Sequence, residues 1–171
     1  ITMNVFLIAA VTADGFIARN SQHLANWTSK EDKQFFIEKT KDAGVVVMGL
    51  NTFKTIGRAL PNRLNIVYSR TEKDLPGVEV TEEEPAKLIQ NLAKRGYKEV
   101  AITGGSQIYT MFMEADLVDT VYLTVEPVLF GSGMNLFSKK IDRKLKLKST
   151  KMLNDDTILV EYKVINEKVL L

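Results

Sequence analysis

The chain has 171 residues, of which 45% are apolar and 26% charged, and this suits one globular domain with a buried core. Its 23 basic and 21 acidic residues leave a net charge of +2, too balanced for the overall charge to recruit nucleic acid or a membrane. The absence of cysteine excludes disulfides and thiolate metal sites, and the single histidine argues against a histidine metal centre. With no signal sequence and no apolar run of transmembrane length, we expect a cytoplasmic protein.

Apolar runs closed by glycine or polar turns predict strands, and amphipathic stretches between them predict helices. Strands are expected at residues 5–11, 45–48, 64–68, 78–80, 99–103, 119–126, 145–153 and 157–165. Helices are expected at residues 28–41, 51–56, 82–95 and 107–114. This order predicts an α/β fold, with a central mixed but mostly parallel sheet flanked by helices and the last two strands as an antiparallel pair.

The patterned part of the chain, residues 3–165, is expected to be one domain. Ile1 and Thr2 precede Met3, so we interpret them as a remnant in front of the natural chain, and residues 166–171 as a C-terminal tail. Residues 15–26 have no sustained period and are predicted to be a long loop, of the kind that often serves as a lid.

The segment after that loop predicts a helix whose first turn carries an acidic group. Thr28 is the expected N-cap, and Glu31 three residues later completes a capping box, which leaves Asp32 unassigned. Asp32 is then either one more acidic residue that complements the helix dipole or a functional carboxylate. Asp32 and Phe36 are four residues apart, so a carboxylate and an aromatic ring project from the same helical face. That pair suits a flat, cationic heterocycle.

Two strand-to-helix junctions fit either plain strand–turn–helix units or an anion-binding cleft. Gly49 ends one apolar strand just before the helix that contains Thr52, and such a helix N-terminus presents free N–H groups to an anion. Gly104-Gly105 ends another strand, which lets a pyrophosphate approach the backbone at the next helix. Arg63 lies in the turn before a third strand, where its planar guanidinium suits a carboxylate.

The stretch VVVMGLNTFKTIGRALPNRLNIVYSR resembles the central motif of the dihydrofolate reductase family. The matching residues are Met48, Gly49, Thr52, Ile56, Gly57, Arg58, Leu60, Pro61, Arg63, Asn65 and Ser69. Trp27, Asp32 and Phe36 also match the spacing on the family's first helix, and Gly104-Gly105 resembles its glycine pair, whose peptide bond is cis. The resemblance covers residues 3–165 and implies a dihydrofolate-reductase-like fold.

This resemblance implies NADPH-dependent reduction of 7,8-dihydrofolate to tetrahydrofolate by hydride transfer to C6 of the pterin. Asp32 would hold the pterin and promote protonation of its N5, Thr124 would hydrogen-bond to Asp32, and Arg63 would bind the glutamate α-carboxylate. The implied catalytic residues are Trp27, Asp32, Tyr109 and Thr124, and the implied substrate contacts are Ala10, Phe36, Leu60 and Arg63. The implied cofactor contacts are Ala9, Ile17, Gly49, Thr52, Ser69, Arg70, Gly104, Gly105, Ser106, Gln107 and Ile108. No metal is implied, and we expect a monomer or homodimer that acts on a small molecule.

Several features leave alternatives open. Leu50 stands where the family commonly has a basic residue for the cofactor's 2′-phosphate, so Arg70 is the local support for NADPH over NADH. Residues 12–15, 27–29, 117–119 and 127–133 also resemble the riboflavin-pathway pyrimidine reductases, which share the fold and the hydride chemistry. In that case Arg63 and Lys33 would meet a sugar phosphate. A third alternative is a nucleotide- or folate-binding protein without catalysis.

Overall fold

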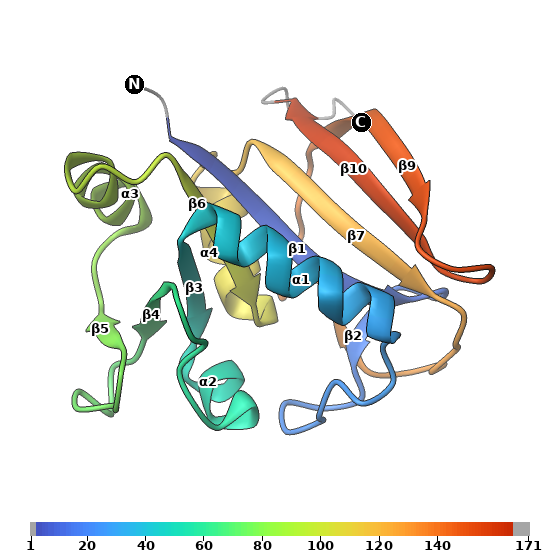
Figure 1. Cartoon of the computed structure of the whole chain (residues 1–171), viewed down its shortest axis with the longest axis horizontal. Helices are drawn as coiled ribbons and strands as arrows, with labels where there is room; N and C mark the ends of the chain where they lie inside the picture. Colours follow the sequence, from blue (N-terminus) through green and yellow to red (C-terminus); the bar gives the residue numbers. More distant parts are fainter. Residues whose placement is uncertain (1–2, 166–171) are drawn as a thin grey trace.

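The computed structural model describes residues 3–165 (Figure 1). Ile1, Thr2 and residues 166–171, interpreted above as a remnant and a tail, lie outside the described residues. Within the described range, eight strands form one sheet in the order β5-β4-β3-β6-β1-β7-β10-β9, and β2 pairs separately with β8.

The sheet is mixed and mostly parallel, as the sequence predicted. Its strands are β1 (Asn4–Thr12), β3 (Val45–Gly49), β4 (Leu64–Tyr68), β5 (Glu79–Thr81), β6 (Glu99–Gly104), β7 (Thr120–Glu126), β9 (Lys144–Met152) and β10 (Ile158–Ile165). The strands from β5 to β7 in the sheet order run parallel, and β10 is antiparallel to both β7 and β9. The predicted fold class, including the antiparallel C-terminal pair, is therefore confirmed.

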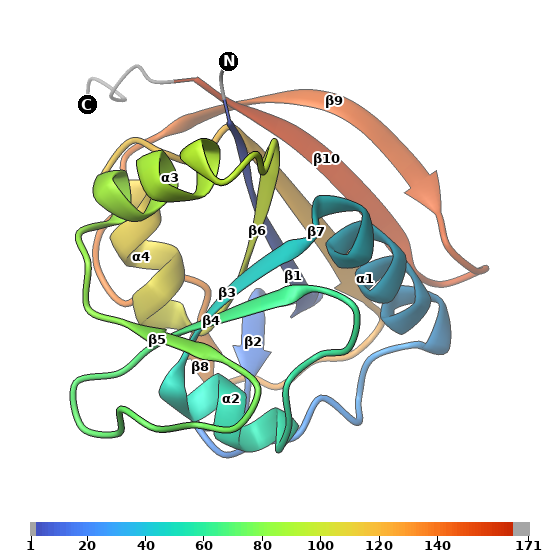
Figure 2. The same ribbon diagram turned by 60° about the vertical axis from the view of Figure 1, so that its left-hand side comes forward.

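Helices cover both faces of the sheet (Figure 2). They are α1 (Lys30–Ala43), α2 (Leu50–Ile56), α3 (Pro85–Lys94) and α4 (Ser106–Glu114). Because side chains alternate along a strand, Phe6 and Ile8 of β1 pack in the core beneath α1 and α2, whereas Val5 and Leu7 pack on the face of α3 and α4. Burial on both faces explains the unbroken apolar runs of the central strands.

The cap of α1 differs from the prediction. Thr28 was expected as N-cap with Glu31 as its partner, and this is wrong: Ser29 is the N-cap, and its Oγ accepts a hydrogen bond from the N–H of Asp32 at 3.1 Å. Thr28 instead donates to the carbonyl oxygen of Ala25. The second half of the cap comes from β7, where Glu126 accepts from the N–H of Ser29 at 3.0 Å. A tertiary contact has replaced the local capping box.

Two further segments differ from the sequence prediction. α3 begins at Pro85 and not at Glu82, because proline has a fixed φ and no N–H and so favours the first helical position. The predicted loop at residues 15–26 contains a short strand, β2 (Phe16–Ala18), which pairs with β8 (Met134–Asn135). The loop is therefore anchored to a distant part of the chain.

Candidate functional site

A cleft of about 1300 Å³ lies at the carboxyl ends of β1, β3, β4 and β6. This is the edge of an α/β sheet at which ligands usually bind. A pocket for one drug-sized ligand measures about 300–1000 Å³, so this cleft is larger than one such ligand needs. One arm runs along α1, and the other passes over the first turns of α2 and α4.

Asp32 projects from the first turn of α1 into the cleft and is half-buried. Burial raises the pKa of its carboxyl group, and the negative charge of Glu126 raises it further. The hydroxyl of Thr124, hydrogen-bonded to Asp32, and the charge of Lys33 act in the opposite direction. The net effect is a carboxyl group that keeps its proton to higher pH than an ordinary aspartate.

The arm along α1 is apolar between two polar ends. Phe36 and Ile37 lie one turn beyond Asp32 and face Ile56 and Leu60 across the cleft, and Ile37 and Ile56 are 41% and 37% exposed. Exposed branched side chains that line a cleft leave apolar surface for a ligand to cover.

Arg63 closes the far end of this arm. Its Nη1 donates to Oγ1 of Thr40 on α1 at 2.5 Å, and its Nε donates to the carbonyl oxygen of Pro61 at 2.9 Å. Partial burial lowers the pKa of the guanidinium, which stays well within the charged range. These bonds fix the guanidinium, and within residues 3–165 its Nη2 has no hydrogen-bond partner, so this edge is available to an anionic ligand.

The other arm is built from two helix N-termini. α2 follows Gly49 and α4 follows Gly105, and within the described residues no side chain caps either helix, so their first N–H groups are free for a ligand. A Cβ at Gly105 would lie 3.5 Å from Oγ1 of Thr52, and a Cβ at Gly49 only 3.1 Å from Cγ1 of Ile108. The Gly104–Gly105 peptide is cis, as in the family that the sequence resembles. Uncapped N–H groups beside bare backbone fit the pyrophosphate of a dinucleotide.

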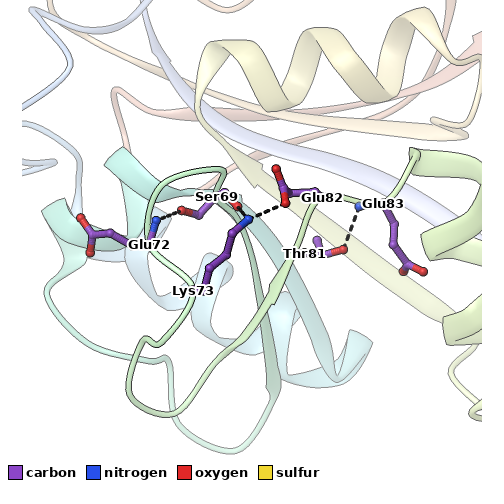
Figure 3. Close-up of polar contacts among 6 residues, drawn as sticks. All are labelled: Ser69, Glu72, Lys73, Thr81, Glu82 and Glu83. Atoms are coloured by element: carbon purple, nitrogen blue, oxygen red, sulfur yellow. Dashed lines mark hydrogen bonds and ion pairs between the residues drawn. The ribbon is translucent and has the colours of Figure 1, made fainter.

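Beyond these helices, the cleft ends in a polar loop after β4 (Figure 3). Oγ of the buried Ser69 accepts from the N–H of Glu72 at 2.9 Å, and Nζ of Lys73 donates to the carbonyl oxygen of Ser69 at 3.1 Å while pairing with Glu82. Arg70 is exposed and makes no ion pair within residues 3–165. It is therefore the cation available to a ligand at this end.

The segment between β1 and α1, which the sequence predicts to be a lid, lines one side of the cleft. Trp27 packs edge-on against Phe130 with ring centroids 5.2 Å apart, and the guanidinium of Arg19 lies 4.1 Å above the same ring. Asp14 accepts hydrogen bonds from the backbone N–H groups of Phe130 and Gly131 at 3.2 and 2.7 Å. Trp27 and Ile17 line the cleft from this side.

All but one of the site residues suggested by the sequence line this cleft. They are Ala9, Ala10, Ile17, Trp27, Asp32, Phe36, Gly49, Thr52, Leu60, Arg63, Ser69, Arg70, Gly104, Gly105, Ser106, Gln107, Ile108 and Tyr109. Thr124 is 1% exposed and lies behind Asp32. Tyr109 is buried, and its hydroxyl donates to the carbonyl oxygen of Ile8 at 2.7 Å, so it supports β1 through that bond.

Sequence reasoning missed Ile37, Lys41 and Glu126. Lys41 follows Ile37 by one helical turn, and both line the cleft beside Phe36, so the helical period could have indicated them. Glu126 follows Thr124 by two residues in β7, and both are buried, so the strand period could have placed them on one face.

The model of the dihydrofolate reductase family matches residues 4–163. The chain belongs to the dihydrofolate reductase family. Dihydrofolate reductase type 3 of Salmonella typhimurium is 35% identical over 123 residues, or 71% of each chain. Dihydrofolate reductase of Enterococcus faecalis, solved with NADP(H) and RAB-propyl, has a TM-score of 0.76 at 24% identity, covering 96% of this chain and 97% of its own. A Shewanella sp. PV-4 protein provisionally assigned to riboflavin biosynthesis has a TM-score of 0.81 at 21% identity, covering 96% and 100%.

Membership of the dihydrofolate reductase family supports an oxidoreductase that reduces a small molecule. The fold itself occurs in both folate and riboflavin proteins, so it does not select between substrates. Residues 3–165 contain no helix long and apolar enough to cross a bilayer. The same residues bring together no group of three or more side chains suited to hold a metal ion.

Proposed function

We propose that the protein reduces 7,8-dihydrofolate to tetrahydrofolate with NADPH. The observation that carries this proposal is the order of chemical groups along α1. Asp32 offers a carboxyl group, apolar side chains follow one turn later, and Thr40 holds the guanidinium of Arg63 at the far end. Asp32 and Thr40 are eight residues apart, which corresponds to about 12 Å along the helix at about 1.5 Å per residue.

A ligand that matches this order has a polar heterocycle at one end, an aromatic middle and a carboxylate at the far end. Dihydrofolate has these parts in this sequence. Its pterin would meet Asp32, its aryl group would cover Phe36, Ile37 and Leu60, and its α-carboxylate would meet Arg63. The fixed guanidinium suits a carboxylate because two parallel N–H groups can bind two oxygens.

The proposed reaction adds a hydride to C6 of the pterin and a proton to N5. A bound reduced nicotinamide would supply the hydride. Asp32 acts on the proton side: its raised pKa keeps a proton on its carboxyl group at a pH where an ordinary aspartate has lost it. Trp27 and Ile17 on the lid side restrict water around the reacting atoms.

The cofactor proposal is supported by the uncapped N-termini of α2 and α4, which would bind the pyrophosphate. The preference for NADPH is supported by Arg70, which would bind a 2′-phosphate at the end of β4. Leu50 contributes no charge there, so we expect Arg70 to carry most of this preference.

A second candidate is reduction of a riboflavin-pathway aminopyrimidine that carries a sugar phosphate. The observation in its favour is a set of polar residues that line the cleft at the start of α1: Asn20, Ser21 and Thr28 before the helix and Lys33 in its first turns. A ribityl or ribosyl chain would find hydrogen-bonding groups there. The apolar side chains between Asp32 and Arg63 favour the folate.

The test is NADPH oxidation by the purified chain, followed by absorbance with dihydrofolate in one cuvette and the aminopyrimidine in another. Oxidation with dihydrofolate alone supports the first proposal. Oxidation with the aminopyrimidine alone would support the second candidate function. No oxidation with either substrate would favour a binding protein without catalysis. An NADH series alongside tests the cofactor preference, and Arg70→Ala should narrow any advantage of NADPH.

A further inference from the structure

Glu126, at the end of β7, is a buried carboxylate that the proposed reaction does not use. It is 2% exposed and is among the largest fully buried side chains of the described chain. Its hydrogen-bond partners within residues 3–165 are neutral: the N–H and hydroxyl of Ser29 at 3.0 and 2.8 Å, and the hydroxyl of Thr157 at 3.3 Å. Burying a carboxylate among neutral donors is costly, so its retention calls for a reason.

The direction of these bonds follows from their partners. The N–H of Ser29 can only donate, and Oγ of Ser29 already accepts from the N–H of Asp32, so its proton points to Glu126. Oε1 of Glu126 therefore accepts two hydrogen bonds and Oε2 accepts one from Thr157. The carboxyl group of Glu126 thus accepts all three of these bonds and donates none of them.

The same bonds connect Glu126 to Asp32. Glu126 holds Ser29, and Ser29 holds the backbone of Asp32 in the first turn of α1. Thr124, two residues earlier on β7, hydrogen-bonds to the side chain of Asp32. The end of β7 thus fixes both the backbone and the carboxyl group of the residue on which the proposed chemistry depends.

We propose that Glu126 is the positioning residue of Asp32, which it serves by holding the first turn of α1 at Ser29 and by placing a second negative charge beside the cleft carboxyl group. This inference rests on the proposed function only for its kinetic consequence. Its structural and electrostatic parts concern the protein without substrate.

The charges around Asp32 give the direction of the effect. Burial is the largest cause of its raised pKa, and Glu126 is the like charge that adds to it. Lys33 on the same helix acts against this increase, and Tyr109 on α4 is a neutral neighbour whose own pKa is raised by burial and by Asp32. Removal of the Glu126 charge should therefore lower the pKa of Asp32.

The first experiment compares pH profiles of turnover for the wild type, Glu126→Gln and Thr157→Val. Glutamine can still accept from both groups of Ser29 and can donate to Thr157, so it removes the charge and keeps the geometry. In Glu126→Gln, the pH at which turnover falls to half on the alkaline side should drop by about 0.5 to 1 pH unit. This is the scale expected for one like charge in a partly solvated cleft. Thr157→Val removes one hydrogen bond but no charge, so its midpoint should match the wild type. An unchanged midpoint in Glu126→Gln, or an equal fall in both variants, would overturn the proposal.

The second experiment needs no activity. The protein is labelled with ¹³C at its aspartate carboxyl groups, the Asp32 signal is identified by its loss in Asp32→Asn, and its titration is compared between wild type and Glu126→Gln. A lower midpoint in the variant supports the proposal even if dihydrofolate is not the substrate, and equal midpoints overturn it. If Glu126→Gln does not fold, Glu126→Asp keeps the charge and should retain the wild-type midpoint, and a lowered midpoint there would contradict the proposal.

Discussion

The carboxyl group of Asp32 is subject to two opposing requirements. Its raised pKa means that the folded protein binds the proton more tightly than the unfolded chain does. Stability is therefore lost as pH rises from the ordinary aspartate pKa of about 3.9 through the raised folded value, at about 1.4 kcal/mol for each pH unit that separates the two pKa values. The proposed chemistry uses this carboxyl group, whereas the fold would be more stable at neutral pH without its charge.

Asp32→Asn should separate these two effects. We expect turnover of dihydrofolate to fall by about 10²- to 10⁴-fold, the usual contribution of a positioned proton donor or acceptor, with little change in the Kd of NADPH. The variant should also melt at a higher temperature than the wild type at pH 7 to 8, and this gain should shrink toward pH 4. Steady-state kinetics test the fall in turnover, titration with NADPH tests the unchanged Kd, and thermal melts across pH test the gain in stability. Unaltered turnover would remove Asp32 from the mechanism.

Arg63→Lys should weaken substrate binding more than it slows turnover. Lysine lacks the planar pair of N–H groups and cannot reproduce the bond to Thr40 that fixes the guanidinium. We expect KM for dihydrofolate to rise by about 10-fold or more, the loss of one charge-assisted hydrogen bond, with turnover within about threefold of the wild type. Arg58→Lys is the matched control, since Arg58 is exposed at the rim. A collapse of turnover at unchanged KM would exclude the binding role.

At the scale of one element, α1 depends on a cap that joins it to β7. In Ser29→Ala, the N–H of Asp32 and the buried Glu126 each lose a hydrogen-bond partner, so we expect a loss of about 1–3 kcal/mol in the free energy of unfolding. Thr28→Ala should cost less than about 0.5 kcal/mol, because within residues 3–165 the hydroxyl of Thr28 bonds only to the nearby carbonyl oxygen of Ala25. Urea unfolding measures both. Equal losses of unfolding free energy in the two variants would mean that Thr28 contributes to the N-cap as much as Ser29 does.

At the scale of the whole molecule, the cleft draws its walls from β1, β3, β4, β6 and α1. A ligand that binds only the folded state stabilises it by about 2.7 kcal/mol at 100 times its Kd. For a domain of this size, that corresponds to a rise of about 5–11 °C in Tm. We expect such a shift with NADPH alone and a larger one with NADPH and a folate analogue together, measured by calorimetry. A Tm that neither ligand changes would contradict the two-ligand cleft.

The sequence predicted those parts of the fold and site that depend on local spacing. Unbroken apolar runs revealed the strands because both faces of the sheet are buried, and the helical period placed Asp32 and Phe36 in one cleft. Contacts between distant segments were not predictable in this way. Ser29 and Glu126 are 97 residues apart, and no local rule indicates that a strand end completes the cap of α1. The start of α3 could have been predicted from the sequence, because proline favours the first position of a helix and Pro85 occupies it.

The aromatic contact between the lid and Phe130 also provides an optical reporter. Trp27 is the only tryptophan of the chain, so all indole emission comes from one ring that lines the cleft and packs 5.2 Å from Phe130. A displacement of the lid changes the polarity around that ring, and a bound reduced nicotinamide absorbs where the ring emits. Stopped-flow fluorescence of the unlabelled protein can therefore follow cofactor binding as quenching of this ring, and a displacement of the segment before α1 as a shift of its emission maximum.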